Sequence, residues 1–261
     1  MSDWGKIFLG TRLEKQVSAT FFLVWMELIK KGLRPGDNVL AVSRMVAHKA
    51  QNALVRAFLA SDCDTFMSLD SDAEVDVGFV ERFRTFEPGF EYDMLQAFYC
   101  RRGWPPRAIW LKKDALGNMM ESFVVSEHLN DEPLTGDVDI VGTHACLIRR
   151  HVFEKLLADA GGDPDNYEWF YYPRHQEDTE DSAFSYDAKA AGFRLGATTA
   201  VRAGHICELT TGWGIYQEYL QLSGRVPLIE RYKRLTGLLA EYTNQDCDTV
   251  LRPVFVAALT R

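Results

Sequence analysis

Two carboxylates stand one residue apart at the end of an apolar run. Residues 66–72 read Phe-Met-Ser-Leu-Asp-Ser-Asp, so Asp70 and Asp72 directly follow a segment typical of a buried strand. In an extended chain residues i and i+2 point to the same side, so both carboxylates can face one hard cation. A divalent ion held by one or two carboxylates keeps coordination positions free for substrate phosphates. The pair indicates a metal site for a phosphorylated ligand, although Asp-x-Asp also occurs in ordinary turns.

Two strand and helix patterns precede this pair. Residues 5–12 and 38–43 have the composition of short strands, and helical patterns follow them from about Lys15 to Lys31 and from Met45 to Ala60. In the second helix apolar side chains recur at helical spacing. The resulting β-α-β-α-β order predicts an α/β fold with a mostly parallel sheet flanked by helices. A ligand crevice is then expected at the carboxyl ends of the strands.

Further motifs follow in the second half of the chain. Residues 139–153 predict a strand that turns into a helix. The pair Glu180-Asp181, with Phe184 three residues later, fits a helix N-terminus, where acidic side chains are stabilised by the helix dipole. Gly204-His205 comes last. The chain thus presents a carboxylate pair, an acidic helix start and a histidine in a fixed order.

In this order the motifs resemble those of GT-A glycosyltransferases, in particular the family 2-like inverting enzymes of bacteria and their viruses. The resemblance covers roughly residues 5–207 and rests on the ordered set. In that family an Asp-x-Asp triplet closes the third strand, as Asp70-Ser71-Asp72 does, and binds the ion and the nucleotide-sugar diphosphate. The resemblance implies a GT-A fold and metal-dependent transfer of a sugar from a nucleotide sugar to an acceptor hydroxyl, with Mn²⁺ or Mg²⁺ as cofactor.

The resemblance also implies roles at the metal and at the reacting hydroxyl. His205, which follows a glycine as in several family members, is expected to bind the ion with Asp70 and Asp72. An imidazole is a softer donor than a carboxylate oxygen, which favours Mn²⁺ over Mg²⁺. Asp181, paired with Glu180, is the expected catalytic base, because inversion requires a carboxylate within reach of the acceptor hydroxyl.

Donor-binding positions are expected at the first strand and in the helix before the triplet. The turn Gly10-Thr11-Arg12 resembles the family's nucleoside-contacting turn, and Asn52 matches an Arg-Asn-x-Leu-Val-like stretch. Gln51 stands in place of the arginine of that stretch. Arg44, His48 and Arg56 are nearby basic alternatives to that arginine.

Several alternatives remain open in the sequence. The pair Glu177-Asp178 competes for the role of base, although the spacing to Phe184 favours the later pair. Retention is not distinguished from inversion. A nucleotidyltransferase also combines such a sheet with an acidic metal site, but it usually begins with a glycine-rich loop, where this chain has only Gly10-Thr11-Arg12. An inactive nucleotide-binding module would show loss of Asp70, Asp72 or Asp181, and all three are present.

Composition restricts the class and the partners. The chain has 261 residues, of which 47% are hydrophobic, enough for one substantial core. A net charge of −8 argues against broad nonspecific binding to nucleic acid, which requires a surplus of Lys and Arg. A local basic cluster around Trp104-Pro105-Pro106 predicts a positive face beside the site; its members are Arg101, Arg102, Arg107, Lys112 and Lys113. The acceptor stays open among glycan, lipid carrier, protein and modified nucleobase.

The cysteines and apolar stretches bear on location. Five scattered cysteines without Cys-x-x-Cys spacing argue against a zinc ribbon or a disulfide framework, and favour a reducing compartment. No secretory signal is apparent. The stretch Ala19–Ile29 is shorter than the ~20 residues that a spanning helix needs, and it contains Glu27. We therefore expect a cytoplasmic protein without a transmembrane segment.

The pattern changes after His205. Residues 212–220 and 228–242 read as amphipathic helices. We expect a nucleotide-sugar-binding catalytic domain over residues 1–207 and a helical C-terminal extension over residues 208–261. Such an extension covers the sheet edge, packs beside the acceptor cleft or mediates homo-oligomer contacts.

Overall fold

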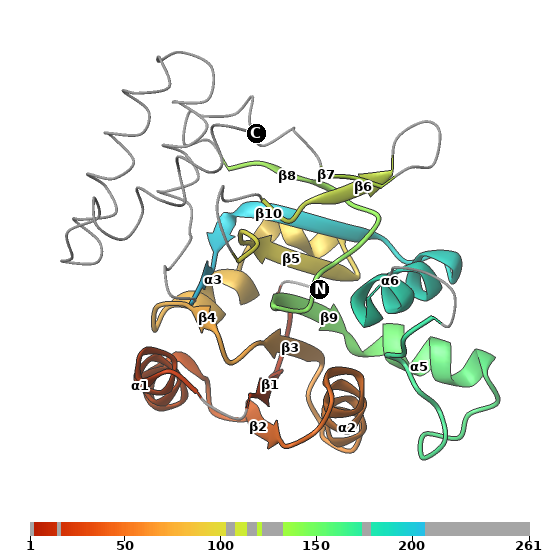
Figure 1. Cartoon of the computed structure of the whole chain (residues 1–261), viewed down its shortest axis with the longest axis horizontal. Coiled ribbons are helices and arrows are strands. Elements are labelled where there is room, and N and C mark those ends of the chain that lie inside the picture. The colour runs from red at the N-terminus through yellow and green to blue at the C-terminus, as the bar shows by residue number, and fades with distance from the viewer. Residues whose placement is uncertain are drawn as a thin grey trace, which may run out of the picture.

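A seven-stranded mixed sheet forms the centre of the computed structural model, which describes residues 3–14, 17–102, 108–113, 119–121, 133–173 and 179–206 (Figure 1). The strand order is β2-β1-β3-β9-β5-β10-β8. The strands are β1 (Ile7–Leu13), β2 (Asn38–Ser43), β3 (Thr65–Leu69), β5 (Met94–Phe98), β8 (Thr135–Asp137), β9 (Ala145–Arg149) and β10 (Leu195–Arg202). Strands β9 and β8 run antiparallel to their neighbours, and the others share one direction. The predicted α/β fold with a mostly parallel sheet is confirmed.

Helices cover both faces of this sheet. In Figure 1, α2, α5 and α6 lie on one side and α1 and α3 on the other. Their bounds, with two short helical turns η1 and η2, are α1 (Ala19–Glu27), η1 (Leu28–Gly32), α2 (Ala47–Leu59), α3 (Phe79–Arg84), η2 (Glu87–Glu91), α5 (Arg150–Asp159) and α6 (Glu180–Ala190). The helix predicted from Lys15 starts at Ala19, because the Ser18 hydroxyl caps it by accepting the Phe21 N–H at 3.0 Å.

Side chains of each central strand alternate between two cores. Phe8 of β1 and Phe66 of β3 pack with an aromatic group from α2, α5 and α6. Leu9 and Met67, one residue further along each strand, pack on the opposite face against α3 and η1. This period of two explains the continuous apolar runs, because both faces of the strands are buried. Gly10 of β1 is required by packing, since an added Cβ would lie 2.6 Å from the Phe66 ring.

Two antiparallel pairings bring distant segments to the edge of the sheet where β3 ends. Strand β9 is inserted between β3 and β5, so its first residues meet the last residues of β3, and the Asp70 N–H donates to the His144 carbonyl at 2.9 Å. Strand β4 (Ala73–Glu74) pairs with β11 (Gly204–His205), which sets His205 opposite Ala73. A further small sheet joins β6 (Leu111–Lys113) and β7 (Met119–Glu121).

Several sequence predictions fall outside the described residues. These are the C-terminal extension 208–261, the pair Glu177-Asp178 and the segment 103–107 of the basic cluster. Within the ranges that the structure describes, no helix has the length and apolarity to cross a bilayer. Cys63, Cys100 and Cys146 are buried and free.

Candidate metal centre and active site

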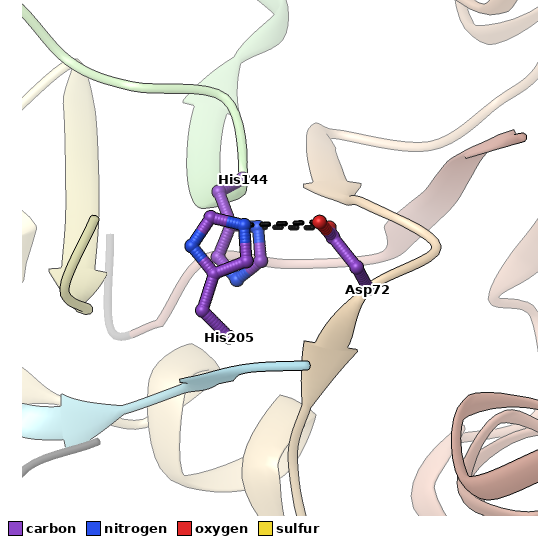
Figure 2. A group of neighbouring side chains, drawn as sticks. All are labelled: Asp72, His144 and His205. Carbon is purple, nitrogen blue, oxygen red and sulfur yellow. Dashed lines mark hydrogen bonds and ion pairs between the residues drawn. The ribbon is translucent and has the colours of Figure 1, made fainter. Parts of the chain in front are cut away.

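Asp72, His144 and His205 meet at the edge of the sheet where β3 ends. The His205 Nε2 atom lies 3.0 Å from Asp72 Oδ2, and the His144 Nδ1 atom lies 3.4 Å from Asp72 Oδ1. One potential ligand atom from each residue falls within 4.8 Å of the others. Figure 2 shows both imidazole rings directed at the Asp72 carboxylate. Three side chains far apart in sequence thus converge on one point.

The hydrogen bonds of the two rings place their protons away from this point. His205 Nδ1 lies 2.9 Å from the Cys100 carbonyl, and His144 Nε2 lies 3.1 Å from the Gly204 carbonyl. A carbonyl only accepts, so in neutral rings these nitrogens carry the hydrogens and the opposite nitrogens carry lone pairs toward Asp72. Burial and the neighbouring His144 lower the pKa of His205 to about 4, which keeps that ring neutral.

This arrangement fits a divalent cation. The His144 Nδ1 atom is buried and has no hydrogen-bond partner. A lone pair that faces a carboxylate is unfavourable unless a positive charge lies between them. Metal-binding histidines commonly donate their second ring N–H to a backbone carbonyl, as both rings do here. One carboxylate and two imidazoles form a donor set that suits Mn²⁺ better than Mg²⁺.

Asp70 lies beside this group but is held by Arg12 of β1. The guanidinium donates to both Asp70 oxygens at 2.8–2.9 Å and to Glu180 Oε1 at 3.0 Å. Asp70 Oδ2 lies 3.8 Å from His144 Nδ1. Burial would raise the pKa of the Asp70 carboxyl, but the charge of Arg12 together with His144 holds that pKa well below its usual range. Asp70 is therefore ionised at neutral pH.

Asp181 stands in the first turn of α6 and takes two hydrogen bonds from Thr143. The Thr143 N–H donates to Oδ2 at 3.1 Å and the hydroxyl donates to Oδ1 at 2.7 Å. Burial raises the pKa of Asp181 to about 6, with the neighbouring Glu180 adding to the rise and Arg12 opposing it. A carboxylate with such a pKa is a stronger base near neutral pH than an ordinary aspartate.

A cleft of about 300 Å³ opens beside the metal-binding group. Its polar lining includes Arg12, Asp70, Asp72, Arg102 and Glu180, and its apolar lining comes from Leu13, Met45, Ala47 and Ala50. The cleft can hold a ligand with an anionic part near the carboxyl end of β3 and a flat, less polar part at the start of α2. Glu180 contributes to the lining, whereas Asp181 is not among the lining residues and accepts its hydrogen bonds from Thr143.

The other predicted donor-binding residues, Gly10, Thr11 and Asn52, are not among the residues that line this cleft. Thr11 is buried and its hydroxyl accepts the Trp25 indole N–H at 3.2 Å. The Asn52 amide is buried and bonds both backbone groups of Phe170, at 2.7 and 3.1 Å. Gln51 donates to the Ser68 hydroxyl at 3.1 Å, and Arg56 donates to carbonyls of residues 164–167. These hydrogen bonds fix the positions of the elements that surround the site.

Sequence reasoning did not identify His144 or Thr143 as functional. Each stands just before the apolar strand β9, where an isolated histidine in an apolar segment usually reads as core. The sequence feature that could have indicated them is their position directly before a strand rather than directly after one. Polar residues at the N-terminal end of a strand reach the same edge as Asp70 only if that strand runs antiparallel, and β9 does.

The comparison with a solved glycosyltransferase structure agrees with the fold. The sequence matches no protein-family model and no curated protein. The structure is similar to that of GalNAc-T7 solved with UDP, GalNAc and Mn²⁺, with a TM-score of 0.50 and 14% identity, over 90% of this chain and 48% of that chain. A197 from STIV is similar over 79% of this chain and 90% of that chain, with a TM-score of 0.48 and 18% identity. The chain thus spans about half the length of the GalNAc-T7 chain and has the GT-A glycosyltransferase fold.

Proposed function

We propose that this chain transfers a sugar from a nucleotide-sugar donor to an acceptor hydroxyl in a metal-dependent reaction. The observation that carries the proposal is the convergence of His144 Nδ1 and His205 Nε2 on the Asp72 carboxylate, beside a cleft with a polar end. The fold supports this proposal, since GalNAc-T7 shares it and was solved with UDP, GalNAc and Mn²⁺.

Asp72, His144 and His205 would hold the divalent cation, with Asp70 as a further ligand or as a contact to the donor ribose. When bound, the cation supplies charge that stabilises the departing diphosphate without a proton. The ionised Asp70 fits either role, because Arg12 fixes its position and leaves it negatively charged. The mixed oxygen and nitrogen donors favour Mn²⁺ over Mg²⁺.

The donor would lie in the cleft with its diphosphate near Asp72 and its base toward the start of α2. The side chains of Leu13 and Met45 offer apolar contacts for a base, and the charged end of the cleft lies at the metal-binding group. Asn52 supports this site through Phe170, and Thr11 supports it through Trp25. Gly10 lets β1 pack closely on Phe66.

Asp181 is the proposed general base. The acceptor oxygen would attack the anomeric carbon from the face opposite the diphosphate, and the carboxylate would take the hydroxyl proton as the bond to the diphosphate breaks. The raised pKa near 6 supports this role, because the group is ionised at neutral pH and still holds a proton well. Glu180, which is ion-paired with Arg12, is the competing carboxylate.

Calorimetry with UDP and GDP, with Mn²⁺ or with EDTA, tests the metal-dependent step. We expect binding that requires Mn²⁺ and that weakens at least about tenfold in Asp72→Ala. Asp76→Ala is the matched control, because it removes an exposed carboxylate that pairs with Arg82 a few residues away. Equal affinity in EDTA and in Mn²⁺ would remove the metal from the proposal. Release of UDP from UDP-sugars, rather than of pyrophosphate from a nucleoside triphosphate, separates sugar transfer from nucleotidyl transfer.

A further inference from the structure

A guanidinium already contacts the atoms that would bind the cation. The Arg102 Nη2 atom is in contact with the Asp72 carboxylate, and the Nε–H donates to His205 Nε2 at 3.0 Å. The same Nη2 also donates to Glu14 Oε1 at 3.2 Å. Because His205 Nε2 is the lone-pair nitrogen of its ring, Arg102 supplies positive charge where the ligand geometry calls for it.

We propose that Arg102 competes with the divalent cation for Asp72 and His205, so that the cation binds only when Arg102 is released. This inference rests on the metal site of the proposed function and adds a residue that sets the affinity of that site. Two positive charges at contact distance repel each other strongly in a partly buried site. Asp72 and His205 are each only 12% exposed at their side chains, so water screens such a repulsion weakly.

The surroundings of Arg102 allow it to leave. Its side chain is 50% exposed, and that of Glu14 is 62% exposed, so the arginine can swing toward solvent and keep its bond to Glu14. Arg12, the other arginine of the cleft, differs in this respect. Its side chain is 17% exposed and is held by Asp70 and Glu180. Arg12 therefore stays in place when the cation binds, whereas Arg102 is the arginine that leaves.

The released guanidinium would still line the cleft, as it does in this structure. Arginine binds phosphate oxygens through two parallel N–H bonds. A diphosphate in the cleft would thus offer Arg102 a new anionic partner in place of Asp72. Nucleotide and metal would then favour each other's binding, because each draws Arg102 away from the same carboxylate.

Titration of the full chain with Mn²⁺ alone, followed by electron paramagnetic resonance of the free ion, tests the competition. When only a fraction of the molecules is able to bind a ligand, the apparent affinity for that ligand is lowered by the same fraction. If Arg102 covers the site in nine of ten molecules, Arg102→Gln should bind Mn²⁺ about tenfold more tightly. Arg101→Gln is the matched control, since it removes the same charge from the neighbouring residue and leaves Arg102 in place; we expect a change within about twofold. Arg102→Lys keeps the charge, so its Mn²⁺ affinity should lie between those of the wild type and Arg102→Gln.

Each result of this titration has a defined meaning. Tighter binding in Arg102→Gln than in Arg101→Gln supports the competition, and so does binding that appears only in Arg102→Gln. Equal or weaker binding in Arg102→Gln overturns the competition and leaves the metal site standing. Failure of both the wild type and Arg102→Gln to bind Mn²⁺ overturns the metal site and with it this inference. Thermal unfolding of each variant checks that the fold is retained.

Discussion

Thr143 donates both its backbone N–H and its hydroxyl to the carboxylate of Asp181, at 3.1 and 2.7 Å. The next residue along the chain, His144, directs its Nδ1 atom at Asp72, 3.4 Å from Oδ1. One short segment before β9 therefore orients the proposed base and one proposed metal ligand together. A small displacement of this segment would disturb proton transfer and cation binding at once.

The first prediction is that Asp181→Asn abolishes most turnover and keeps donor and metal binding. The substitution preserves size and removes the basic lone pair, so we expect kcat to fall about 10²- to 10⁴-fold, with donor affinity changed little. Sugar release from the donor in the presence of an acceptor measures kcat, and calorimetry measures donor affinity. Asp178→Asn is the control from the competing acidic pair. If Asp178→Asn or Glu180→Gln abolishes transfer while Asp181→Asn stays within a few-fold of wild type, the base is misassigned.

A second prediction concerns the cost of the raised pKa of Asp181 to stability. The folded pKa is about 6 and the ordinary value is 3.8, so between these values the folded state holds a proton that the unfolded state has lost. Stability from this group is thus complete below about pH 4 and declines as the pH rises to about 6. Asp181→Asn carries no titrating carboxyl at this position and avoids this loss. The unfolding free energy of the variant minus that of the wild type should therefore rise by about 3 kcal/mol from pH 4 to pH 7, at about 1.4 kcal/mol per pKa unit. Urea unfolding at both pH values measures the difference, and a difference that does not change with pH would exclude the raised pKa.

The first three strands of the main sheet, and two of the three side chains that converge at Asp72, could be predicted from the sequence. Asp70 and Asp72 were found because they end an apolar run, and this pattern is local. The alternation of strands and helices before them predicts parallel neighbours, which β1, β2 and β3 are. His205 was predicted from its place in the order of motifs, and the pairing of β11 with β4 sets it beside Asp72.

The remaining part of the site depends on contacts that no local pattern encodes. The insertion of β9 between β3 and β5 places His144 at the metal group, and its direction is set by packing on both neighbours. Arg102 lay in a predicted basic cluster, but its contact with Asp72 requires the fold to bring residues 72 and 102 together. Asn52 matched a motif for donor binding, yet its amide bonds the Phe170 backbone, 118 residues away in sequence.

The third prediction is that His144 is as important for metal affinity as His205. His144→Gln and His205→Gln should each weaken Mn²⁺ binding about tenfold or more, because each removes one of three converging ligand atoms. His151→Gln is the matched control, since that histidine is exposed and pairs with Asp93 at the opposite end of β9. Mn²⁺ titration of the folded variants measures the affinities. An unchanged Mn²⁺ affinity in His144→Gln would return this histidine to a packing role.

The fourth prediction separates a structural role of Asn52 from contact with the donor. Asn52→Leu leaves the buried N–H and carbonyl of Phe170 without partners, and each such group costs about 1–3 kcal/mol. We expect a lower urea midpoint and nearly unchanged UDP affinity at temperatures where the variant is folded. Unchanged stability with a large loss of UDP affinity would instead assign Asn52 to the donor.

The last prediction is that Arg12 holds three carboxylates at the site together. The Arg12 guanidinium bonds Asp70 and Glu180, and its charge also acts on Asp181. Arg12→Met keeps much of the side-chain volume but leaves these carboxylates without a cation, so we expect a loss of about 3 kcal/mol of unfolding free energy at pH 8, as for other buried ion pairs with one partner removed.

The pH dependence follows from the depressed pKa of Asp70. In the wild type Arg12 holds this pKa well below its usual range, so the folded carboxyl stays ionised at both pH 8 and pH 4. In Arg12→Met this charge no longer opposes burial, which raises the pKa, so the carboxyl of the variant takes up a proton as the pH falls and the cost of an unpaired buried charge declines. The difference between Arg12→Met and wild type should therefore shrink toward acid pH. Arg82→Met is the control, because Arg82 pairs with Asp76 at the surface and its loss should cost less than about 1 kcal/mol. Urea unfolding at pH 8 and pH 4 makes both comparisons, and equal losses in the two variants at pH 8 would show that the Arg12 pair contributes no more than a surface contact.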